Sequence, residues 1–207
     1  MDDRTTQDLK NSIDIDRFRL RSFIESLQGS DQLDIREDKV DLADMAAAMQ
    51  GNPKAVWFKK AGPEGVEVVG NVVGGRERLA RALGVEKTEI VEELLRRLKL
   101  PPQLVTLSRE DAPVQQVVVT GDEIDVLKMP VHLQHAFDGA PYISATVDFC
   151  VDPATGLSNC GLRRLMLRGP QETGVDLNAP SDLRAIYMAA QARGEKLPVA
   201  YGLGMDP

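Results

Sequence analysis

The chain has 207 residues and carries 25 Lys and Arg against 32 Asp and Glu, which gives a formal net charge of -7. This length allows one large domain or two small ones. The acidic balance, without any basic block, argues against nucleic acid or an anionic membrane as the main partner. The chain has neither an apolar leader segment at its start nor a run of about 18 apolar residues. We therefore expect a cytoplasmic protein.

The first half of the sequence alternates helical and strand patterns. Residues 1–14 are expected to form a loosely held lead-in. Helical spacing of apolar residues occurs at 15–27, 41–50 and 86–98, and short strand patterns occur at 33–36, 55–58 and 66–73. The alternation predicts a small α/β domain over residues 1–112.

A glycine-rich segment, residues 70–84 (GNVVGGRERLARALG), leads from a strand into a helix. Such a junction can hold a phosphate at the N-terminus of the helix. The segment lacks the Lys-Ser/Thr pair of a P-loop and the spacing of a dinucleotide-binding fingerprint, so a structural turn is the favoured interpretation.

The second half is rich in strand patterns, and its main feature is a predicted hairpin. Residues 142–151 alternate apolar and polar side chains, which is the period of a half-buried strand. Residues 152–156 (DPATG) have the composition of a turn, and residues 157–167 form the returning strand. The remaining predicted elements are β-runs at 114–119 and 123–127, a helix at 182–193 with Ser181 at its cap and Gly194 at its end, and a strand at 197–201.

Arginines are concentrated on the returning strand. Arg163, Arg164 and Arg168 lie there together with Asn159. Guanidinium groups in this number favour a wall that faces an anion, because Arg offers a planar donor fork suited to phosphate or carboxylate. The alternative is an edge strand whose arginines are simply solvated. The local pattern does not decide between the two.

Two cysteines, Cys150 and Cys160, flank the hairpin turn. In a reducing compartment we expect them to be free thiols that pack as small apolar groups. The loop ahead of the hairpin contains His132 and His135 in H-x-x-H spacing, with Asp138 nearby. A pair of histidines in a loop is weak evidence for zinc, so these residues are interpreted as orienting the loop.

Asn159 and Asp182 are the more interesting candidates for a metal site. Both carry oxygen donors, and Asp182 stands where a helix is predicted to begin. A hard cation such as Mg²⁺ or Mn²⁺ could bridge them to a cofactor phosphate. The alternative for Asp182 is an ordinary acid that offsets the helix dipole. No Ser-His-Asp constellation occurs, so acid-base chemistry is left to carboxylates.

The order and spacing of several short motifs resemble the UbiD family of decarboxylases, which use prenylated FMN. The motifs are Phe18–Leu27 with Leu33–Ile35 and Val40-Asp41; Gly70-Asn71-x-x-Gly74 with Arg76, Arg78 and Ala82-Leu83-Gly84; Pro130, His135, Asp138-Gly139 and Pro141–Ile143; and Asp152-Pro153-x-Thr155-Gly156. The resemblance implies an N-terminal α/β domain followed, over residues 113–207, by an incomplete split β-barrel that binds flavin.

The resemblance also implies roles for individual residues. Asn159 would match the asparagine that binds the divalent metal of the flavin phosphate. Arg164 would match the arginine that lies over the isoalloxazine and orders the catalytic carboxylates. Other implied cofactor-binding residues are Gly161, Leu162 and Arg163 along the flavin, and Ser181 and Asp182 where many relatives carry a histidine metal ligand. The implied cofactors are prenylated FMN and Mn²⁺ or Mg²⁺, with K⁺ as a further cation.

One geometric condition applies to this assignment. Asn159 and Arg164 are an odd number of positions apart, so a regular strand would place them on opposite faces of the sheet. We therefore predict an irregularity within Cys160–Leu162, for which Gly161 is a suitable site.

Three hypotheses for function follow. The leading one is the N-terminal part, or a separate subunit, of a homo-oligomeric carboxy-lyase that reversibly decarboxylates an aromatic or α,β-unsaturated acid. It would be inactive without a second chain or missing C-terminal half that supplies the acid-base carboxylates. The second is a non-catalytic flavin-binding or assembly module. The third is a fragment with no independent role, which would expose apolar surface where the rest of the barrel should pack.

Overall fold

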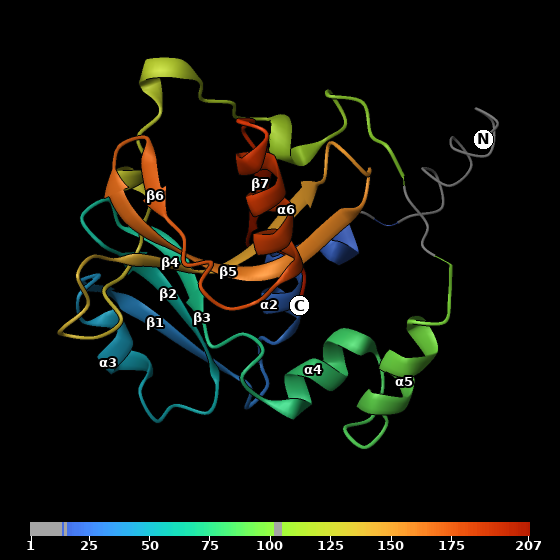
Figure 1. The fold of residues 1–207 in the computed structure, drawn as a ribbon. Helices are drawn as coiled ribbons and strands as arrows, with labels where there is room; N and C mark the ends of the chain where they lie inside the picture. Colours follow the sequence, from blue (N-terminus) through green and yellow to red (C-terminus); the bar gives the residue numbers. More distant parts are fainter. Residues whose placement is uncertain (1–13, 15, 102–104) are drawn as a thin grey trace.

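The computed structural model describes residues 14, 16–101 and 105–207, and these residues form two sheets, one in each half of the chain (Figure 1). The predicted lead-in lies almost wholly outside the described residues. The first half contains, in chain order, η1 (Asp16–Phe18), α2 (Leu20–Ser26), β1 (Leu33–Val40), α3 (Met45–Met49), β2 (Ala55–Ala61), β3 (Val66–Gly70), α4 (Arg76–Leu83) and α5 (Ile90–Arg97). The second half contains η2 (Pro113–Gln115), η3 (Gly121–Glu123), η4 (Val126–Lys128), β4 (Tyr142–Val151), β5 (Ser158–Gly169), β6 (Glu172–Gly174), α6 (Asp182–Ala192) and β7 (Val199–Leu203).

The first sheet has the order β1-β2-β3, with β2 parallel to β1 and antiparallel to β3. Its central strand β2 begins with four buried apolar residues in a row, so both faces of the sheet are covered. Ala55 and Trp57 pack with residues of α2 on one face, whereas Val56 and Phe58 pack with Met45 of α3 on the other. This half therefore contains the two larger apolar clusters.

The helices and strands predicted for the first half are present, with shifted boundaries. The helices are shorter than the periodic patterns; α5, for example, begins at Ile90 because Glu86–Glu89 form a turn closed by a hydrogen bond from Glu89 N to Glu86 O. The apolar stripe of α5 is largely uncovered. Figure 1 shows α5 away from both sheets, and Val91, Leu94, Leu95 and Leu98 are 45–80% exposed.

The second sheet is antiparallel with the order β6-β5-β4-β7. It contains the predicted hairpin as β4 and β5, the predicted final strand as β7, and α6 as the predicted helix, with Gly194 in a left-handed conformation after its end. Asp152 organises the turn by accepting hydrogen bonds from Ala154 N (3.0 Å) and Thr155 Oγ1 (2.6 Å), which hold the pKa of its carboxyl below the ordinary value. An isolated bridge joins Arg19 to Met205, so the start and the end of the described chain lie side by side.

The prediction of β-runs at 114–119 and 123–127 is wrong. These residues form the short 3₁₀ turns η2, η3 and η4 and connecting segments instead. Pro113 begins the first of these turns, and Asp125 accepts a hydrogen bond from Leu127 N (3.0 Å), so local bonds replace a strand ladder. The segment is fastened at the turn between β5 and β6, where Val126 N donates to Pro170 O (2.8 Å) and Gln171 Nε2 donates to Gly121 O (3.1 Å).

In the middle of the hairpin the mainly polar face is buried and the apolar face is exposed, which is the reverse of the usual arrangement. Thr146, Asp148 and Cys150 are buried, whereas Phe149 and Val151 on the other face are 41% and 55% exposed. The apolar cluster of this sheet is small and lies at one end, around Ile143, Leu165 and Leu167. The middle of the sheet is therefore held together by polar groups.

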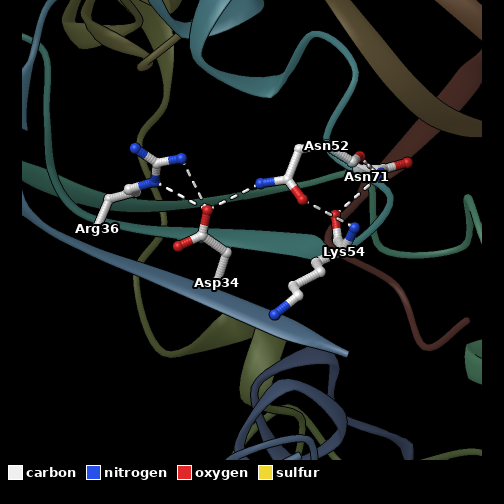
Figure 2. Close-up of polar contacts among 5 residues, drawn as sticks. All are labelled: Asp34, Arg36, Asn52, Lys54 and Asn71. Carbon is white, nitrogen blue, oxygen red and sulfur yellow. Dashed lines mark hydrogen bonds and ion pairs between the residues drawn. The ribbon is translucent and has the colours of Figure 1, made fainter. Parts of the chain in front are cut away.

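The glycine-rich junction after β3 is built around Asn71, which has a φ of 54°. Its amide nitrogen donates to the carbonyls of Asn52 (3.0 Å) and Lys54 (2.8 Å). Asn52 in turn donates to Asp34 Oδ2 (2.8 Å), which also accepts from Arg36 Nε (2.9 Å), so the network in Figure 2 ties the junction to β1.

Arg78 holds the same junction from inside the protein. Its side chain is 1% exposed and donates to Val72 O (2.8 Å), Asn71 O (3.1 Å) and Gln32 Oε1 (3.1 Å). Burial lowers the pKa of its guanidinium. Because these donors are used within the protein, the geometry supports a structural turn rather than a phosphate cradle.

No helix among the described residues has the length and apolar character required to cross a membrane.

Replacing Arg78 by methionine should destabilise the fold strongly, because a buried guanidinium that binds three acceptors would be lost. We expect Arg78→Met to lower the free energy of unfolding by about 2–4 kcal/mol. Arg76→Met, on the exposed side of the same helix, should change it by less than about 0.5 kcal/mol. Urea unfolding followed by circular dichroism measures both; equal effects of the two substitutions would contradict this role of Arg78.

Candidate functional site

The centre of the second sheet contains a fully buried carboxylate, Asp148 on β4. In the strand register it lies opposite Gly161 of β5 on one side and Tyr201 of β7 on the other. Asn159 Nδ2 donates to Asp148 Oδ2 (3.2 Å), and Arg163 Nε lies 3.3 Å from Asp148 Oδ1. The residues two positions before and two positions after Gly161 thus both reach this one carboxylate.

The charge of Asp148 is compensated incompletely. Asp148 Oδ1 and Arg163 Nε form an ion pair without hydrogen-bond geometry, and neither atom has another hydrogen-bond partner in the described part of the chain. Burial raises the pKa of Tyr201 and that of the Cys150 thiol, and the negative charge of Asp148 adds to both shifts. The polar centre of this sheet therefore contains a buried ion pair that influences neighbouring side chains.

Asp148 did not stand out as a functional residue in the sequence, although a signal exists. It lies in mid-strand between Val147 and Phe149, and a carboxylate at such a position is almost never buried unless it is paired. Its partners are on a different strand, so they follow from the register and not from the local pattern.

Gly161 is required by this carboxylate. A Cβ atom at Gly161 would lie 3.0 Å from Asp148 Oδ1, so the missing side chain makes room for the carboxylate. The prediction of an irregularity within Cys160–Leu162 is wrong, because the ladder is regular from Ser158 to Arg163. The register shift lies on the partner strand between Ile143 and Thr146, where β4 has one extra residue.

The regular ladder separates Asn159 from Arg164. Asn159 and Arg163 share the inner face, whereas Arg164 lies on the outer face, where it is exposed. The two residues assigned jointly to the flavin therefore do not converge in this structure. Arg163, which was expected only to lie along the cofactor, is the arginine that reaches the surroundings of Asn159.

A cavity of about 990 Å³ lies beside the second part of β5. We call it the arginine pocket, because Arg163, Arg164 and Arg168 line it together with Leu162, parts of β4 and the loops at 134–138 and 174–178. Arg163 is paired with Asp148, but the side chains of Arg164 and Arg168 form no hydrogen bond or ion pair within residues 16–101 and 105–207. Both side chains are exposed to solvent, so a wall facing an anion and an edge with solvated arginines both fit this pocket.

The histidines ahead of the hairpin organise a loop. His135 N donates to Asp138 Oδ2 (3.0 Å), and the imidazole Nδ1 lies 3.5 Å from the same oxygen. Burial lowers the pKa of His132. Among the residues that the structure describes, no group of three or more His, Cys, Asp or Glu is arranged to hold a metal ion.

Asn159 and Asp182 have the chemistry of ligands for a hard cation. The amide nitrogen of Asn159 is bound to Asp148, which leaves its Oδ1 without a partner among the described residues. Asp182 is exposed in the first turn of α6 and forms no ion pair with another described residue, while Ser181 caps the helix by accepting from Arg184 N (3.3 Å). No hydrogen bond joins Asn159 to Asp182. The donor set fits Mn²⁺ or Mg²⁺ but supplies only two ligands.

The two cysteines are free thiols on opposite faces of the hairpin. Cys150 is buried and pairs with Asn159 in the ladder, whereas Cys160 is exposed and pairs with Phe149. The side chains of adjacent ladder pairs point to opposite sides of a sheet. The two thiols therefore belong to neighbouring ladder pairs but lie on opposite faces of the sheet.

Two family models match the chain. Residues 24–98 match the 3-octaprenyl-4-hydroxybenzoate carboxy-lyase N-terminal domain, and residues 105–207 match the Rift-related domain of the same enzymes. The chain belongs to the UbiD family. This agrees with its mixed architecture of a small sheet with helices followed by a four-stranded antiparallel sheet.

Curated relatives include decarboxylases. The chain is 34% identical over 143 residues to anhydromevalonate phosphate decarboxylase of Methanosarcina mazei, an alignment that covers 69% of this chain and 32% of that protein. It is 30% identical over 207 residues to phenolic acid decarboxylase of Sedimentibacter hydroxybenzoicus, covering 91% of this chain and 42% of the relative. The chain thus spans less than half the length of these proteins.

Solved structures agree with this assignment. An evolved dimeric form of the UbiD-class enzyme HmfF from Pelotomaculum thermopropionicum, in complex with prenylated FMN, superposes with a TM-score of 0.85 at 30% identity. The superposition covers 91% of this chain and 45% of that one. The fold of both halves is therefore that of the first part of a UbiD-class enzyme.

The fit between Gly161 and Asp148 can be tested by a double-mutant cycle. We expect Gly161→Ala to lower the free energy of unfolding by about 1–3 kcal/mol, because the added Cβ displaces the carboxylate. In an Asp148→Ala background the same substitution should cost close to nothing, which gives a coupling energy of similar size.

Gly169→Ala is the matched control on the same strand, because its nearest contact would be an ordinary 3.9 Å. Chemical denaturation of the four proteins measures the cycle. Additive effects of the two substitutions would show that the carboxylate does not occupy the space above Gly161.

Proposed function

We propose that this chain is the N-terminal part, or a subunit, of a carboxy-lyase that uses prenylated FMN to decarboxylate an aromatic or α,β-unsaturated acid reversibly. The observation that carries the proposal is the arginine pocket, which is lined by the unpaired side chain of Arg164, the residue that the resemblance assigns to the family's arginine. The family membership of the chain and the decarboxylases among its relatives support the reaction class.

Each residue of the site has a proposed task. Arg164 binds the carboxylate of the substrate and orients the acid that delivers the proton. Gly161, Leu162 and Arg163 lie along the cofactor, and Asp148 fixes Arg163 and Asn159 from below through the contacts at 3.3 Å and 3.2 Å. Bound prenylated FMN supplies the electron sink that decarboxylation requires.

The cofactor phosphate is proposed to be held through a cation. Asn159 Oδ1 and the Asp182 carboxylate, both without protein partners in the described chain, would be its ligands, with Ser181 placing Asp182 at the start of α6. Mn²⁺ or Mg²⁺ suits such oxygen donors, and K⁺ is the proposed second cation. A further ligand has to come from outside the described residues.

The remaining half of the barrel is proposed to cover the apolar outer face of the hairpin. This face includes Phe149, Val151 and Leu162, which are 41%, 55% and 78% exposed. A continuation of the chain or a second polypeptide that packs here would also bring the acid-base carboxylates to the pocket. The chain alone is then inactive, and the assembled enzyme is proposed to be a cytoplasmic homo-oligomer.

The catalytic part of the proposal predicts the effect of removing Arg164. In the chain combined with its C-terminal half and prenylated FMN, Arg164→Ala should lower kcat/KM for an unsaturated acid at least about 100-fold, because both substrate binding and proton delivery lose a charge-assisted contact. Flavin absorbance should stay unchanged. Arg97→Ala on α5 is a remote control. Full turnover by the Arg164→Ala protein would refute this role, and full turnover by the lone chain would refute the need for a C-terminal half.

A second function, a flavin-binding or assembly module without catalysis, is favoured by one observation. The two acids that line the arginine pocket serve the backbone of their loops: Asp138 accepts from His135 N (3.0 Å), and Asp176 accepts from Asn178 N (2.9 Å). Within the described chain both carboxylates of the pocket are therefore engaged in hydrogen bonds of their own loops.

Titration of the lone chain with FMN and Mn²⁺ separates the two functions. Tight binding of FMN and Mn²⁺ without a partner indicates a cofactor module, and binding only with the C-terminal half indicates a divided enzyme.

Asp182→Asn should weaken the Mn²⁺ affinity about tenfold or more in whichever of these two proteins binds the cation, since an amide is a weaker ligand than a carboxylate. Asp122→Asn on η3 is the control. Calorimetry measures both, and an unchanged Mn²⁺ affinity would exclude Asp182 as a ligand.

A further inference from the structure

Helix α5 presents an apolar stripe to solvent. Val91, Leu94, Leu95 and Leu98 recur at the spacing of one helical face, and each of them is at least 45% exposed. Neither sheet covers this face, because α5 lies away from both (Figure 1). Apolar side chains that are grouped on one exposed helical face mark a surface at which another protein element packs.

Another face of α5 is fastened to the protein. Ile90 is buried, and Arg97 Nη2 donates to the carbonyl of Leu83 at the end of α4 (2.6 Å). Arg96 and Arg97 each donate to the carboxylate of Glu93 at 2.7 Å, and these hydrogen bonds lower the pKa of Glu93 to about 2. The helix is therefore held in one orientation, with its apolar stripe directed away from these contacts.

Charges of opposite sign lie beside the two ends of the stripe. Glu92 flanks its N-terminal end, and Lys99 flanks its C-terminal end seven positions later, on the same side of the helix. The helical winding continues to this point, since Lys99 N donates to Arg96 O (3.2 Å). The side chains of Glu92 and Lys99 are exposed, and neither forms a hydrogen bond or ion pair in the described part of the chain.

This pattern is complementary to itself in one orientation. A two-fold axis perpendicular to α5 and through the middle of the stripe makes two copies of the helix antiparallel. Val91 of one copy then lies against Leu98 of the second copy, and Glu92 lies beside Lys99. A parallel pair would instead bring Glu92 against Glu92 and Lys99 against Lys99. The charges that border the stripe therefore fit a second copy of the same chain.

We propose that α5 is a homodimer contact in which the apolar stripes of two copies of this chain pack antiparallel. The inference assigns a surface to the proposed homo-oligomer and does not rest on the proposed chemistry. A pair of eight-residue helices buries less than the about 800 Å² per partner of a standard interface. The contact should therefore be reversible, with a dissociation constant on the order of 10–100 µM.

Analytical ultracentrifugation of the full chain over about 1–200 µM measures this association without cofactor or turnover. We expect an equilibrium between monomer and dimer. Leu95→Glu places a carboxylate at the centre of the contact and should raise the dissociation constant at least about 50-fold. Val151→Glu on the outer face of the hairpin is the matched control, because both side chains are 55% exposed, and it should leave the dimer intact. Circular dichroism checks that both variants are folded.

Charge reversal tests the antiparallel orientation. Glu92→Lys should weaken the dimer about fivefold or more, because two like-charged pairs replace two attractive ones. Adding Lys99→Glu to this variant restores opposite charges and should return the dissociation constant to within about twofold of that of the natural chain.

Four results would each overturn the inference: a natural chain that stays monomeric, a dimer that persists in Leu95→Glu or is lost in Val151→Glu, a double reversal that does not restore the dimer, and a C-terminal half that displaces the second copy from α5. Failure of the proposed decarboxylation would be seen separately, as lack of CO₂ release by the assembled protein while the Leu95-dependent association persisted.

Discussion

The second sheet depends on the neutralisation of one buried carboxylate. Asp148 is fully buried at the middle of β4, and taking such a group out of water costs several kcal/mol unless it is paired. Three residues of β5 offset this cost: Arg163 supplies a positive charge, Asn159 donates a hydrogen bond, and Gly161 leaves space for the carboxylate. Removing one partner of a buried ion pair destabilises a protein more than replacing the whole pair by apolar residues. Asp148, Asn159, Gly161 and Arg163 therefore form one energetic unit.

This unit has consequences for the site because it fixes which way each residue of β5 points. Once Asn159 and Arg163 turn inward to Asp148, the alternation of the strand sends Leu162 and Arg164 outward. The same constraint orients the Asn159 amide, since its nitrogen is bound and only its oxygen is left for a cation. The polar core of the sheet thus fixes the side-chain orientations of the candidate site. An apolar core would hold the strands together but would not orient these polar side chains.

The sequence predicted the first half well because its signals are local. The apolar run at Ala55–Phe58 and the helices beside it bury one another at short range, and periodicity detects such elements directly. The valines at 117–119 misled the prediction, because β-branched residues favour strands only where a neighbouring strand is available, and none pairs with them among the described residues. Strand propensity alone does not supply a partner.

The candidate site could be predicted in composition but not in geometry. Its arginines, its asparagine and the caps of α6 are visible in the sequence, and the family motifs point to the same residues. Which face each occupies depends on the register between β4 and β5, and that register is set by Asp148 opposite Gly161 and by the extra residue between Ile143 and Thr146. Both features join positions more than ten residues apart. The three arginines of one strand therefore have two kinds of surroundings. Arg163 is paired with a buried carboxylate, whereas Arg164 and Arg168 lie on the other face of the strand, where their side chains are exposed along the cavity.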